Sequence, residues 1–303
     1  MIQFIKYKNI FFALTTIALL ASVAAIAVYK LKPSIDFTGG SILELQYNGN
    51  LPTQQAVKDA IKDLNLKDVS MYTVGSNEIS LRTENLTQNV HAKLLADLNK
   101  TGDFQEKSFE AIGPTVGTEI KNRTIMLVVV SLLAMLVYIA IAFRNVPGPV
   151  SSWKYGIASF IVLSHDVLVT LGVLAVLGYF WGVQITIPVI TALLTVIGYA
   201  INNVIVVYDR LRENLTRDRK AEFGEIANRA VNQTLSRQIN TSVATLLPVF
   251  AIYFLAGETL KYFALALILG VVAGTYSSIF LSSQILVVWM GLDGKKQSQN
   301  KAK

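Results

Sequence analysis

The chain has 303 residues, of which 52% are hydrophobic and only 16% are charged. A soluble domain of this size typically has about 25% charged residues, so the composition excludes an ordinary soluble globular protein. The mean hydropathy of +0.48 also indicates a chain more apolar than a soluble domain. The net charge is +7, and the absence of cysteine excludes disulfide bonds and thiolate metal sites. These properties predict an α-helical polytopic membrane protein.

Six apolar segments account for the hydropathy, and each approaches or exceeds the ~20 residues that a helix needs to cross a bilayer. They cover residues 10–28, 124–143, 155–178, 185–208, 239–255 and 262–290. The first follows Lys6 and Lys8, as the core of a signal peptide would, but its apolar run is long and no small-residue cleavage pattern follows it. We therefore interpret it as a membrane anchor, and the sequence predicts six transmembrane helices.

A polar insert, residues 30–123, lies between the first two predicted spans and is long enough to fold on its own. Hydrophobic periodicity predicts in turn a strand, helix, strand, turn, strand, helix and strand. These elements cover residues 41–47, 53–64, 69–74, 75–77, 78–82, 86–98 and 104–112. The order β-α-β-β-α-β is that of a ferredoxin-like α+β domain. We interpret His91, the one histidine of the insert, as an ordinary surface residue.

Lysines and arginines are distributed unevenly among the connecting segments. They gather before the first span, between the second and third, between the fourth and fifth, and after the sixth, whereas the short loops on the other side carry only Lys261. By the positive-inside rule, both termini and the loop at 209–238 are cytoplasmic. The expected organisation is an N-terminus with the first span (1–29), an extracytoplasmic domain (30–123), a bundle of five spans (124–290) and a basic cytoplasmic tail (291–303).

The fourth predicted span contains Asn202 and Asn203, one to two turns before a polar cluster. The cluster consists of Asp209, Arg210, Arg212, Glu213 and Asn214. At 1.5 Å per residue the two asparagines lie roughly 10 Å inside the hydrocarbon, where an unpaired amide is costly. Thr191 and Thr195 share a helix stripe with Asn202. We expect this stripe to face the bundle and to line a path for a cation or water.

The third predicted span contains the adjacent pair His165 and Asp166. Asp166 is the only carboxylate deep within a predicted span, near the bilayer centre, which suits proton uptake. Adjacent residues point ~100° apart on a helix, so the two side chains need not touch. A purely structural role, in which both side chains hydrogen-bond to neighbouring helices, remains open.

Two further patterns concern helix packing. In the sixth span, Gly270, Gly274, Ser278 and Ser282 recur at intervals of four, which permits close packing between helices. The same face also offers a contact for a partner subunit. In the loop at 209–238, residues 223–231 form an amphipathic helix that we expect at the membrane surface.

Two motifs flank the polar insert. Asp36-Phe37-Thr38-Gly39-Gly40 follows the first span, and Gly113-Pro114-Thr115-Val116-Gly117-Thr118-Glu119 precedes the second. Other motifs are GYAINNVIVVYDRLREN at 198–214, Ser164-His165-Asp166, and NQTLSR at 232–237. Together they resemble the signature segments of the SecD/SecF protein-export family, and their order around six spans is similar to that of its SecF branch.

The resemblance implies a subunit of the cell membrane, in the RND superfamily, that works with SecD and the SecYEG channel. Such a subunit helps unfolded exported chains through on the outer side by using proton or sodium flow, and it needs no cofactor and no nucleic acid. The resemblance also implies that residue 203 is usually an aspartate that takes up the proton, modulated by an arginine at the position of Arg237.

This chain has Asn203 instead. An amide does not titrate in the physiological range, although its oxygen can ligate a cation or accept a hydrogen bond. Three explanations remain open: loss of coupling, use of sodium, and relocation of the proton to another carboxylate such as Asp166.

The glycines of the flanking motifs also allow two interpretations. Gly39 and Gly40 permit a tight bend, while Gly113, Pro114 and Gly117 permit a rigid corner followed by a hinge. Either the outer domain rocks on these residues while it holds an unfolded chain, or they are simply turns at a domain boundary.

Other functions find less support in the sequence. It contains no GxSxG elbow, no HExxH helix, no nucleophilic cysteine and no paired intramembrane aspartates, so we expect neither an enzyme nor a metal site. An RND-type small-molecule exporter has twice as many spans and two inserts, so this chain would be half of one and would need SecD or a second copy. A passive translocon scaffold without ion flow is the third alternative, which Asn203 favours.

Overall fold

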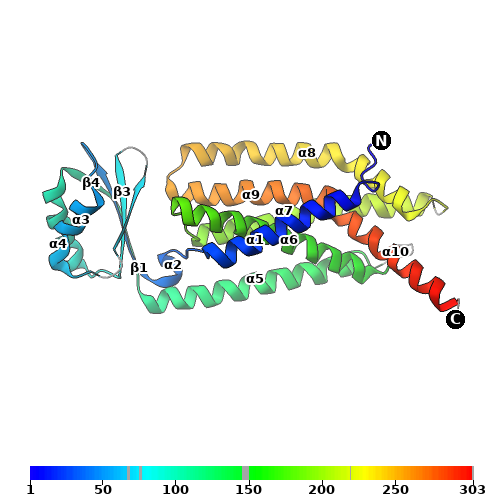
Figure 1. Cartoon of the computed structure of the whole chain (residues 1–303), viewed down its shortest axis with the longest axis horizontal. Coiled ribbons are helices and arrows are strands. Elements are labelled where there is room, and N and C mark those ends of the chain that lie inside the picture. The colour runs from blue at the N-terminus through cyan, green and yellow to red at the C-terminus, as the bar shows by residue number, and fades with distance from the viewer. Residues whose placement is uncertain (67–68, 75–76, 145–149, 219, 302–303) are drawn as a thin grey trace. The chain divides into compact units, whose positions relative to one another are not determined.

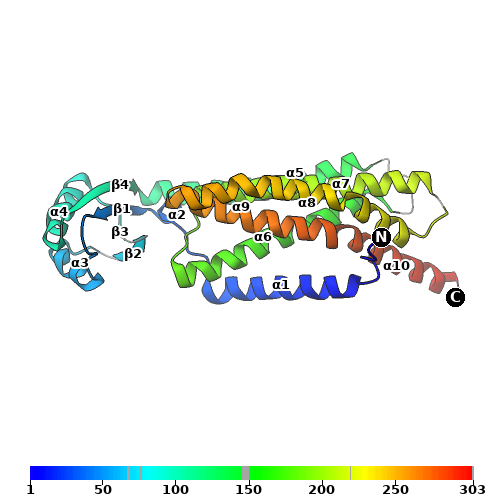
Figure 2. The same cartoon turned by 90° about the horizontal axis from the view of Figure 1, so that it is seen from above.

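The computed structural model describes residues 1–66, 69–74, 77–144, 150–218 and 220–301. Two residues of the turn predicted at 75–77, and the last two residues of the basic tail, lie outside the described residues. The chain divides into two compact units. Unit 1 comprises Met1–Leu31, Leu127–Val183 and Pro188–Lys303, and unit 2 comprises Lys32–Met126 and Gln184–Ile187. Figures 1 and 2 show the helices and strands of both.

Most of the described chain is helical, and six of its helices are long and apolar enough to cross a membrane. The first five are α1 (Lys8–Tyr29), α5 (Pro114–Ala142), α6 (Ser152–Trp181), α7 (Ile187–Arg217) and α8 (Phe223–Leu255). The sixth span joins α9 (Glu258–Phe280) to the start of α10 (Ser282–Lys301). Six helices thus coincide with the six predicted spans, and several of them extend beyond the apolar segments into polar sequence.

The loop predicted at 209–238 was wrong in its extent. Helices α7 and α8 fill most of this segment and leave only residues 218–222 between them. The polar composition of this segment favoured a loop in the sequence analysis. At helical spacing, however, polar residues can pair with one another, as Glu213 does with Arg210 and Arg217. Such pairs stabilise the exposed end of α7.

The amphipathic helix predicted at 223–231 is the first part of α8 rather than a separate surface helix. Its apolar side, with Ile226, Ala227 and Ala230, is buried in the main hydrophobic core of unit 1. Helix periodicity identified the correct face, but it did not show that the face packs against other helices of the same chain.

An aromatic cluster joins the ends of α5, α6 and α7. The ring centroids of Phe143 and Tyr155 lie 5.4 Å apart, those of Phe143 and Tyr208 5.7 Å, and those of Tyr155 and Tyr208 5.0 Å. All three side chains are buried. Aromatic pairs of this kind add about 0.5–1.5 kcal/mol each beyond the area that they bury, so this cluster fixes the relative positions of the three helices at this end.

Small residues let the helices of unit 1 approach closely. A side chain at Gly270 of α9 would overlap Val196 of α7, and one at Gly274 would lie 3.0 Å from Ala200. The face of the sixth span that carries Gly270, Gly274, Ser278 and Ser282 is buried and packs against helices of the same chain. It is therefore not free for the partner contact that we considered from the sequence.

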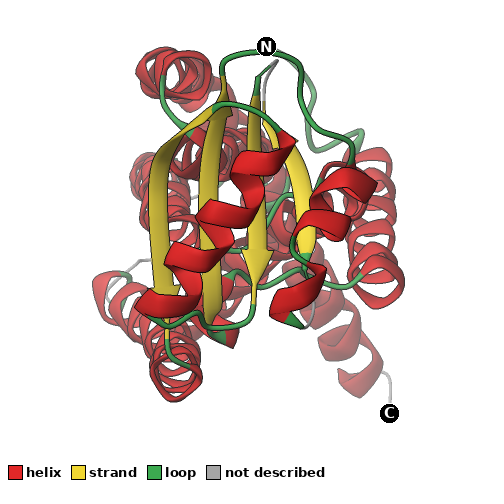
Figure 3. Cartoon of the chain, turned by 90° about the vertical axis from the view of Figure 1, so that its left-hand side faces the viewer, coloured by secondary structure: helices red, strands yellow, loops and turns green. Residues whose placement is uncertain are grey.

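Unit 2 contains a four-stranded antiparallel sheet with the strand order β2-β3-β1-β4. Two helices cover one of its faces (Figure 3). The elements follow in the predicted order: β1 (Gly40–Tyr47), α3 (Gln54–Ala60), β2 (Ser70–Val74), β3 (Glu78–Thr83), α4 (Gln88–Leu98) and β4 (Phe104–Ile112). Alternate residues of β1 and β3 are buried beneath α3 and α4, which explains why the period of two was visible in the sequence.

Two details of unit 2 differ from expectation. The first helix, predicted to run to residue 64, ends at Ala60 and is followed by a short 3₁₀ turn; it buries Val57. His91 is partly buried instead of being an ordinary surface residue: its ring stacks on Phe109 at 3.9 Å, and its Nε2 lies 3.3 Å from a carboxylate oxygen of Glu106. Helix α4 lies against β4 at this point, which the helix pattern alone did not show.

Candidate functional site

Asn203 lies on the buried side of α7. It is only 2% exposed, and its side-chain Nδ2 has no hydrogen-bond partner among the described residues. A buried polar group without a partner costs about 1–3 kcal/mol, and such groups are rare in native proteins. Asn203 is therefore a candidate for a residue whose presence reflects function rather than stability.

A hydroxyl chain links three helices one turn away from Asn203. The Tyr199 hydroxyl of α7 lies 2.8 Å from the Ser242 hydroxyl of α8. Ser242 lies 2.6 Å from the Thr275 hydroxyl of α9. Because each hydroxyl both donates and accepts, the three side chains form a continuous polar connection across the core of unit 1.

A second polar connection runs between α8 and α9 through Gln238, which is buried. Its Oε1 accepts a hydrogen bond from the Ser278 hydroxyl at 2.7 Å, and its Nε2 donates to the Thr234 hydroxyl at 3.2 Å. Sequence reasoning missed this set. The signal was present, because Thr234, Gln238 and Ser242 recur every four residues and so lie on one face of α8.

His165 and Asp166 form a buried pair on α6, being 4% and 1% exposed. His165 Nδ1 lies 3.0 Å from Asp166 Oδ1, so the two side chains do touch although adjacent helix positions diverge. The Ser277 hydroxyl of α9 donates to Asp166 Oδ2 at 2.8 Å. Gly274 lies beside this carboxylate, and a Cβ there would lie 3.5 Å from Oδ2, an ordinary van der Waals contact. Asp166 therefore links α6 to α9, a contact that the sequence did not indicate.

The polar stripe of α7 does not face the bundle of this chain. Thr191, Thr195 and Asn202 are all exposed, and the Thr195 hydroxyl donates to the Thr191 carbonyl at 2.9 Å. The three residues share a face as predicted, but it is the outer face. The expectation failed because α7 is apolar on almost every side within the span, so the hydrophobic pattern does not distinguish the packed face from the outer one.

Arg237 is exposed on α8. No contact between described residues joins its guanidinium to Asn202 or Asn203, so the predicted approach of this arginine to the two amides is not seen. Asn203 faces the interior while Arg237 faces outward, and Ser242 and Gln238 occupy the buried face of α8. The described residues also include no group of three or more His, Asp or Glu side chains that could hold a metal ion.

The charged end of α7 connects to α8 through Asn214. This residue is buried, and its Nδ2 donates to Gln233 Oε1 at 2.9 Å. Arg210 and Glu213 form an ion pair on the same helix. The exposed members of the predicted cluster are Asp209 and Arg212.

In unit 2, Asp36 caps the first residue of α7. It lies in the short helix α2 (Ile35–Thr38), and its Oδ2 accepts hydrogen bonds from the Ile187 backbone N–H at 2.9 Å and from the Ser34 hydroxyl at 2.9 Å. The four N–H groups of a helix start have no partner within the helix, and a carboxylate there is stabilised by the helix dipole as well. The flanking motif thus holds the start of the helix that carries Asn203.

Arg82 of β3 fastens the same segment to the sheet. Its guanidinium donates to the Pro33 carbonyl at 3.1 Å and to the Thr38 hydroxyl at 2.8 Å. Partial burial lowers the pKa of Arg82 from its ordinary value, but an arginine stays protonated at neutral pH. Phe37, the middle residue of the motif, is buried. Sequence reasoning did not identify Arg82, which lies far from the motif along the chain.

The glycines of the two flanking motifs meet in space. Gly39 and Gly40 have φ of 72° and 130°, which residues with side chains rarely adopt. A Cβ on Gly39 would lie 2.7 Å from Pro114 Cα, and a Cβ on Gly117 would lie 2.7 Å from the Gly39 nitrogen. At Gly113, in contrast, a Cβ would meet nothing within 4 Å.

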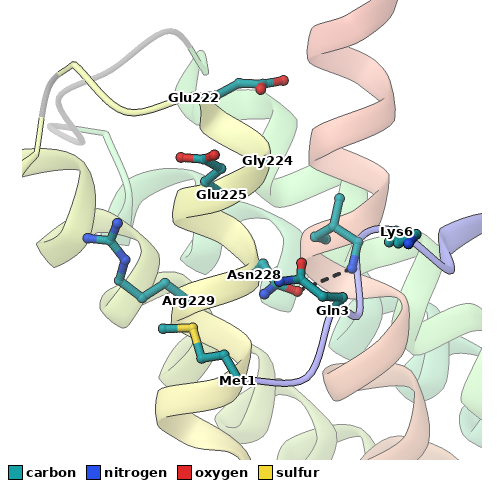
Figure 4. Close-up of a pocket in the computed structure, with 9 residues that line it drawn as sticks. Met1, Gln3, Lys6, Glu222, Gly224, Glu225, Asn228 and Arg229 are labelled. Carbon is teal, nitrogen blue, oxygen red and sulfur yellow. Dashed lines mark hydrogen bonds between the residues drawn. The ribbon is translucent and has the colours of Figure 1, made fainter.

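The N-terminal residues of unit 1 are bound to α8. Asn228 Nδ2 and Asn232 Nδ2 donate to the Ile2 carbonyl at 3.0 and 2.8 Å, and Phe4 is buried nearby. Figure 4 shows the Asn228 side chain extending from α8 toward this segment, where both border a hollow of about 380 Å³. Its rim carries acidic and basic side chains in equal number: Lys6, Glu222, Glu225 and Arg229. We assign it no ligand.

Residues 91–292 match the family model of the protein export membrane protein SecD/SecF, C-terminal, and residues 24–50 match the SecD/SecF GG motif. The protein translocase subunit SecF of Thermobaculum terrenum is 36% identical over 97% of this chain and 95% of its own length. That of Anaerolinea thermophila is 35% identical over 95% of this chain and 94% of its own length. The chain belongs to the SecF family.

Some relatives of this SecF-family chain are longer. The protein translocase subunit SecDF of Thermus thermophilus is 35% identical over 89% of this chain, which spans only 36% of the SecDF length. The crystal structure of SecDF from Thermus thermophilus matches with a TM-score of 0.84 and 32% identity, over 96% of this chain and 39% of that one. The family and the six apolar helices together make this chain a multi-pass membrane protein.

The two family matches divide the candidate residues of the SecF-family chain. The GG motif contains the capping residue Asp36 together with Gly39 and Gly40. The C-terminal match contains the intramembrane polar residues, including Asp166 and Asn203. The close-packed glycines, the capping aspartate and the buried polar residues of α6, α7, α8 and α9 therefore all lie within the residues that the two family models match.

Proposed function

We propose that this SecF-family chain assists protein export across the cell membrane as an accessory subunit that uses ion flow. In this proposal it acts with SecD beside the SecYEG channel, both termini lie in the cytoplasm, and unit 2 lies on the outer side, where it holds unfolded exported chains. The observation that carries the proposal is the polar set buried among α6, α7, α8 and α9. Polar and ionisable side chains inside a membrane are costly and typically mark paths for ions or protons.

The exposed stripe of α7 supports a partner subunit. Thr191, Thr195 and Asn202 present polar atoms on the outside of a helix that is apolar enough to span a membrane. Hydroxyl and amide side chains in such a position favour contact with another helix over contact with lipid. The longer relatives named SecDF support SecD as that partner. The chain then forms one pseudo-symmetric half of a larger transporter-like assembly.

We assign unit 2 to the ferredoxin-like arrangement. The element order β-α-β-β-α-β and the antiparallel strand order β2-β3-β1-β4 support this assignment. An antiparallel sheet covered by helices on one face leaves its other face available. We propose that this sheet face contacts the exported chain.

Asp166 is our candidate for the proton carrier, because Asn203 cannot titrate. It is the one buried carboxylate in the described spans, and both of its oxygens have hydrogen-bond partners that can rearrange when a proton binds. The buried Nε2 of His165 has no partner among the described residues, so the pair has an unused site through which a proton can pass.

The test is late-stage export by the chain reconstituted with SecD and SecYEG. Release of an exported protein is measured first under a proton gradient and then under a sodium gradient. We expect the wild type to respond to protons and Asp166→Asn to lose the response. Asp209→Asn, which removes an exposed carboxylate, serves as the matched control and should leave the response intact.

Other outcomes would overturn parts of the proposal. A response to sodium alone would make sodium the coupled ion and remove the role of Asp166 as a proton carrier. No response to either gradient, together with a proton response in Asn203→Asp, would make this chain a passive scaffold. Asn203, which stands where an aspartate is expected, is the specific observation that favours the scaffold alternative.

A further inference from the structure

A hollow of about 320 Å³ lies where α5 ends and the charged end of α7 begins. Four residues line it: Ile141, Ala142, Arg144 and Arg212. Two arginines, both exposed, therefore border one small space, while the other two lining residues are apolar. Two cations on one hollow repel each other unless an anion lies between them.

Neither guanidinium has an acidic partner among the residues that the structure describes. Glu213, the nearest acidic residue along the chain to Arg212, already pairs with Arg210 and Arg217. Arg144 follows the end of α5, and its backbone N–H donates to the Ile141 carbonyl at 3.2 Å, which continues the helical turn. The two charges are thus not compensated by an acidic side chain of the described residues.

The aromatic cluster described above fixes the backbone near these two arginines. Arg144 directly follows Phe143, and Arg212 lies one helical turn beyond Tyr208. The Phe143 and Tyr208 rings pack edge to face at 5.7 Å, and the Tyr208 hydroxyl donates to the Ser282 carbonyl at 3.3 Å. These contacts fix the backbone from which both arginine side chains extend, so the two side chains start from defined positions beside one hollow.

Composition places the hollow at the level of the lipid headgroups. The apolar part of α5 ends immediately before it, and α6 starts soon afterwards along the chain with Trp153. Trp153 packs against Trp289 with their ring centroids 5.1 Å apart. Tryptophan is enriched at membrane–water interfaces, so these rings indicate the headgroup layer at this end of unit 1.

We propose that this hollow binds the phosphate group of an anionic membrane lipid. Arg144 and Arg212 would hold the phosphate oxygens, for which the planar guanidinium fork is well suited, and Ile141 and Ala142 would contact the apolar part of the lipid. A soluble phosphate would gain nothing from the apolar wall, so the lining favours a lipid over a free anion. Basic pockets between membrane helices commonly bind anionic headgroups.

The test compares lipid retention by the purified full chain. Delipidated protein in detergent is incubated with equal amounts of phosphatidylglycerol and phosphatidylcholine, and the lipids that stay bound are counted by native mass spectrometry. We expect the wild type to retain phosphatidylglycerol preferentially. Loss of each arginine should weaken retention about fivefold, so Arg144→Gln/Arg212→Gln should lose nearly all of it.

The matched control is Arg210→Gln/Arg217→Gln, which removes the same charge from the same end of α7 but leaves the hollow intact. It should retain phosphatidylglycerol like the wild type. Equal retention by Arg144→Gln/Arg212→Gln and the wild type would overturn the site, and an equal loss in the control would reduce it to general surface charge. Displacement of the lipid by excess inorganic phosphate would show a free-anion site instead.

A second double variant covers the case in which the glutamine variant does not fold. Arg144→Lys/Arg212→Lys keeps both charges but loses the two-pronged hydrogen bonding. It should fold and still bind several-fold less phosphatidylglycerol than the wild type. Unchanged retention in this variant would contradict a phosphate held by the guanidinium forks.

Discussion

Gly39 and Gly117 lie so close together that a side chain on either one would collide with the other motif. A Cβ on Gly39 would lie 2.7 Å from Pro114 Cα, and its φ of 72° adds backbone strain. The contact gives these glycines a packing role that is independent of any hinge motion. Gly113, four residues before Gly117, has open space where a Cβ would be.

We predict that Gly39→Ala destabilises the protein by about 1–3 kcal/mol, because it combines the strain with the collision. Gly113→Ala is the control and should change the stability by less than about 0.5 kcal/mol. The midpoint of thermal unfolding in detergent measures both. Equal midpoints for the two variants would contradict the close packing of the two motifs.

Asn203 should show a conflict between stability and function. We predict that Asn203→Leu raises the stability by about 1–3 kcal/mol, because it removes a buried N–H that has no partner among the described residues. The same change should abolish ion-dependent export. Thermal unfolding and the export assay measure the two effects, with exposed Asn202→Leu as the comparison for thermal unfolding alone. A lower unfolding midpoint for Asn203→Leu would mean that the amide has a stabilising partner.

Helix α7 depends at its start on a residue far away in the sequence. Asp36 accepts a hydrogen bond from the Ile187 N–H, the first of the helix. We predict that Asp36→Ala costs about 1 kcal/mol, and that Asp36→Asn costs less because its amide oxygen still accepts the bond. Hydrogen exchange of the first turn of α7 reports the loss directly. Unchanged exchange in Asp36→Ala would exclude the cap.

The elements themselves were largely predictable, and the reason lies in their periodicity. The strands of unit 2 alternate because one face is buried, and the six spans are long apolar runs, so both patterns are local. The extent of the loop predicted at 209–238 was wrong because polar residues of this segment, such as Glu213, form ion pairs along a helix, which a hydrophobic pattern does not detect. Contacts between elements were not predictable: neither Asp36 with Ile187 nor Asp166 with Ser277 leaves a local signal.

At the scale of the whole molecule, the exposed polar stripe of α7 is the surface that we propose contacts a partner subunit. We predict that Thr195→Trp abolishes copurification with SecD, because a bulky ring on this exposed face prevents close helix contact. Ile17→Trp on α1, where the side chain is also exposed, is the matched control and should copurify normally. The isolated subunit should keep its unfolding midpoint in both cases. Normal copurification of Thr195→Trp would place the partner elsewhere.

The sequence could not reveal this surface, because the side of a membrane helix that faces lipid is as apolar as the side that packs. Thr191, Thr195 and Asn202 were correctly placed on one stripe, but only the packing of Val196 against Gly270 shows that the stripe faces away from the bundle. The same limit applies to Arg237, whose exposed position depends on how α8 rotates about its axis.

The contact between Gly39 and Pro114 also means that the residues on either side of segment 40–112 lie next to each other. A segment whose two ends coincide behaves as an insertion, since its length and content can change without pulling the flanking residues apart. Related chains can therefore enlarge, shorten or exchange this segment through evolution while the helices before and after it keep their own packing.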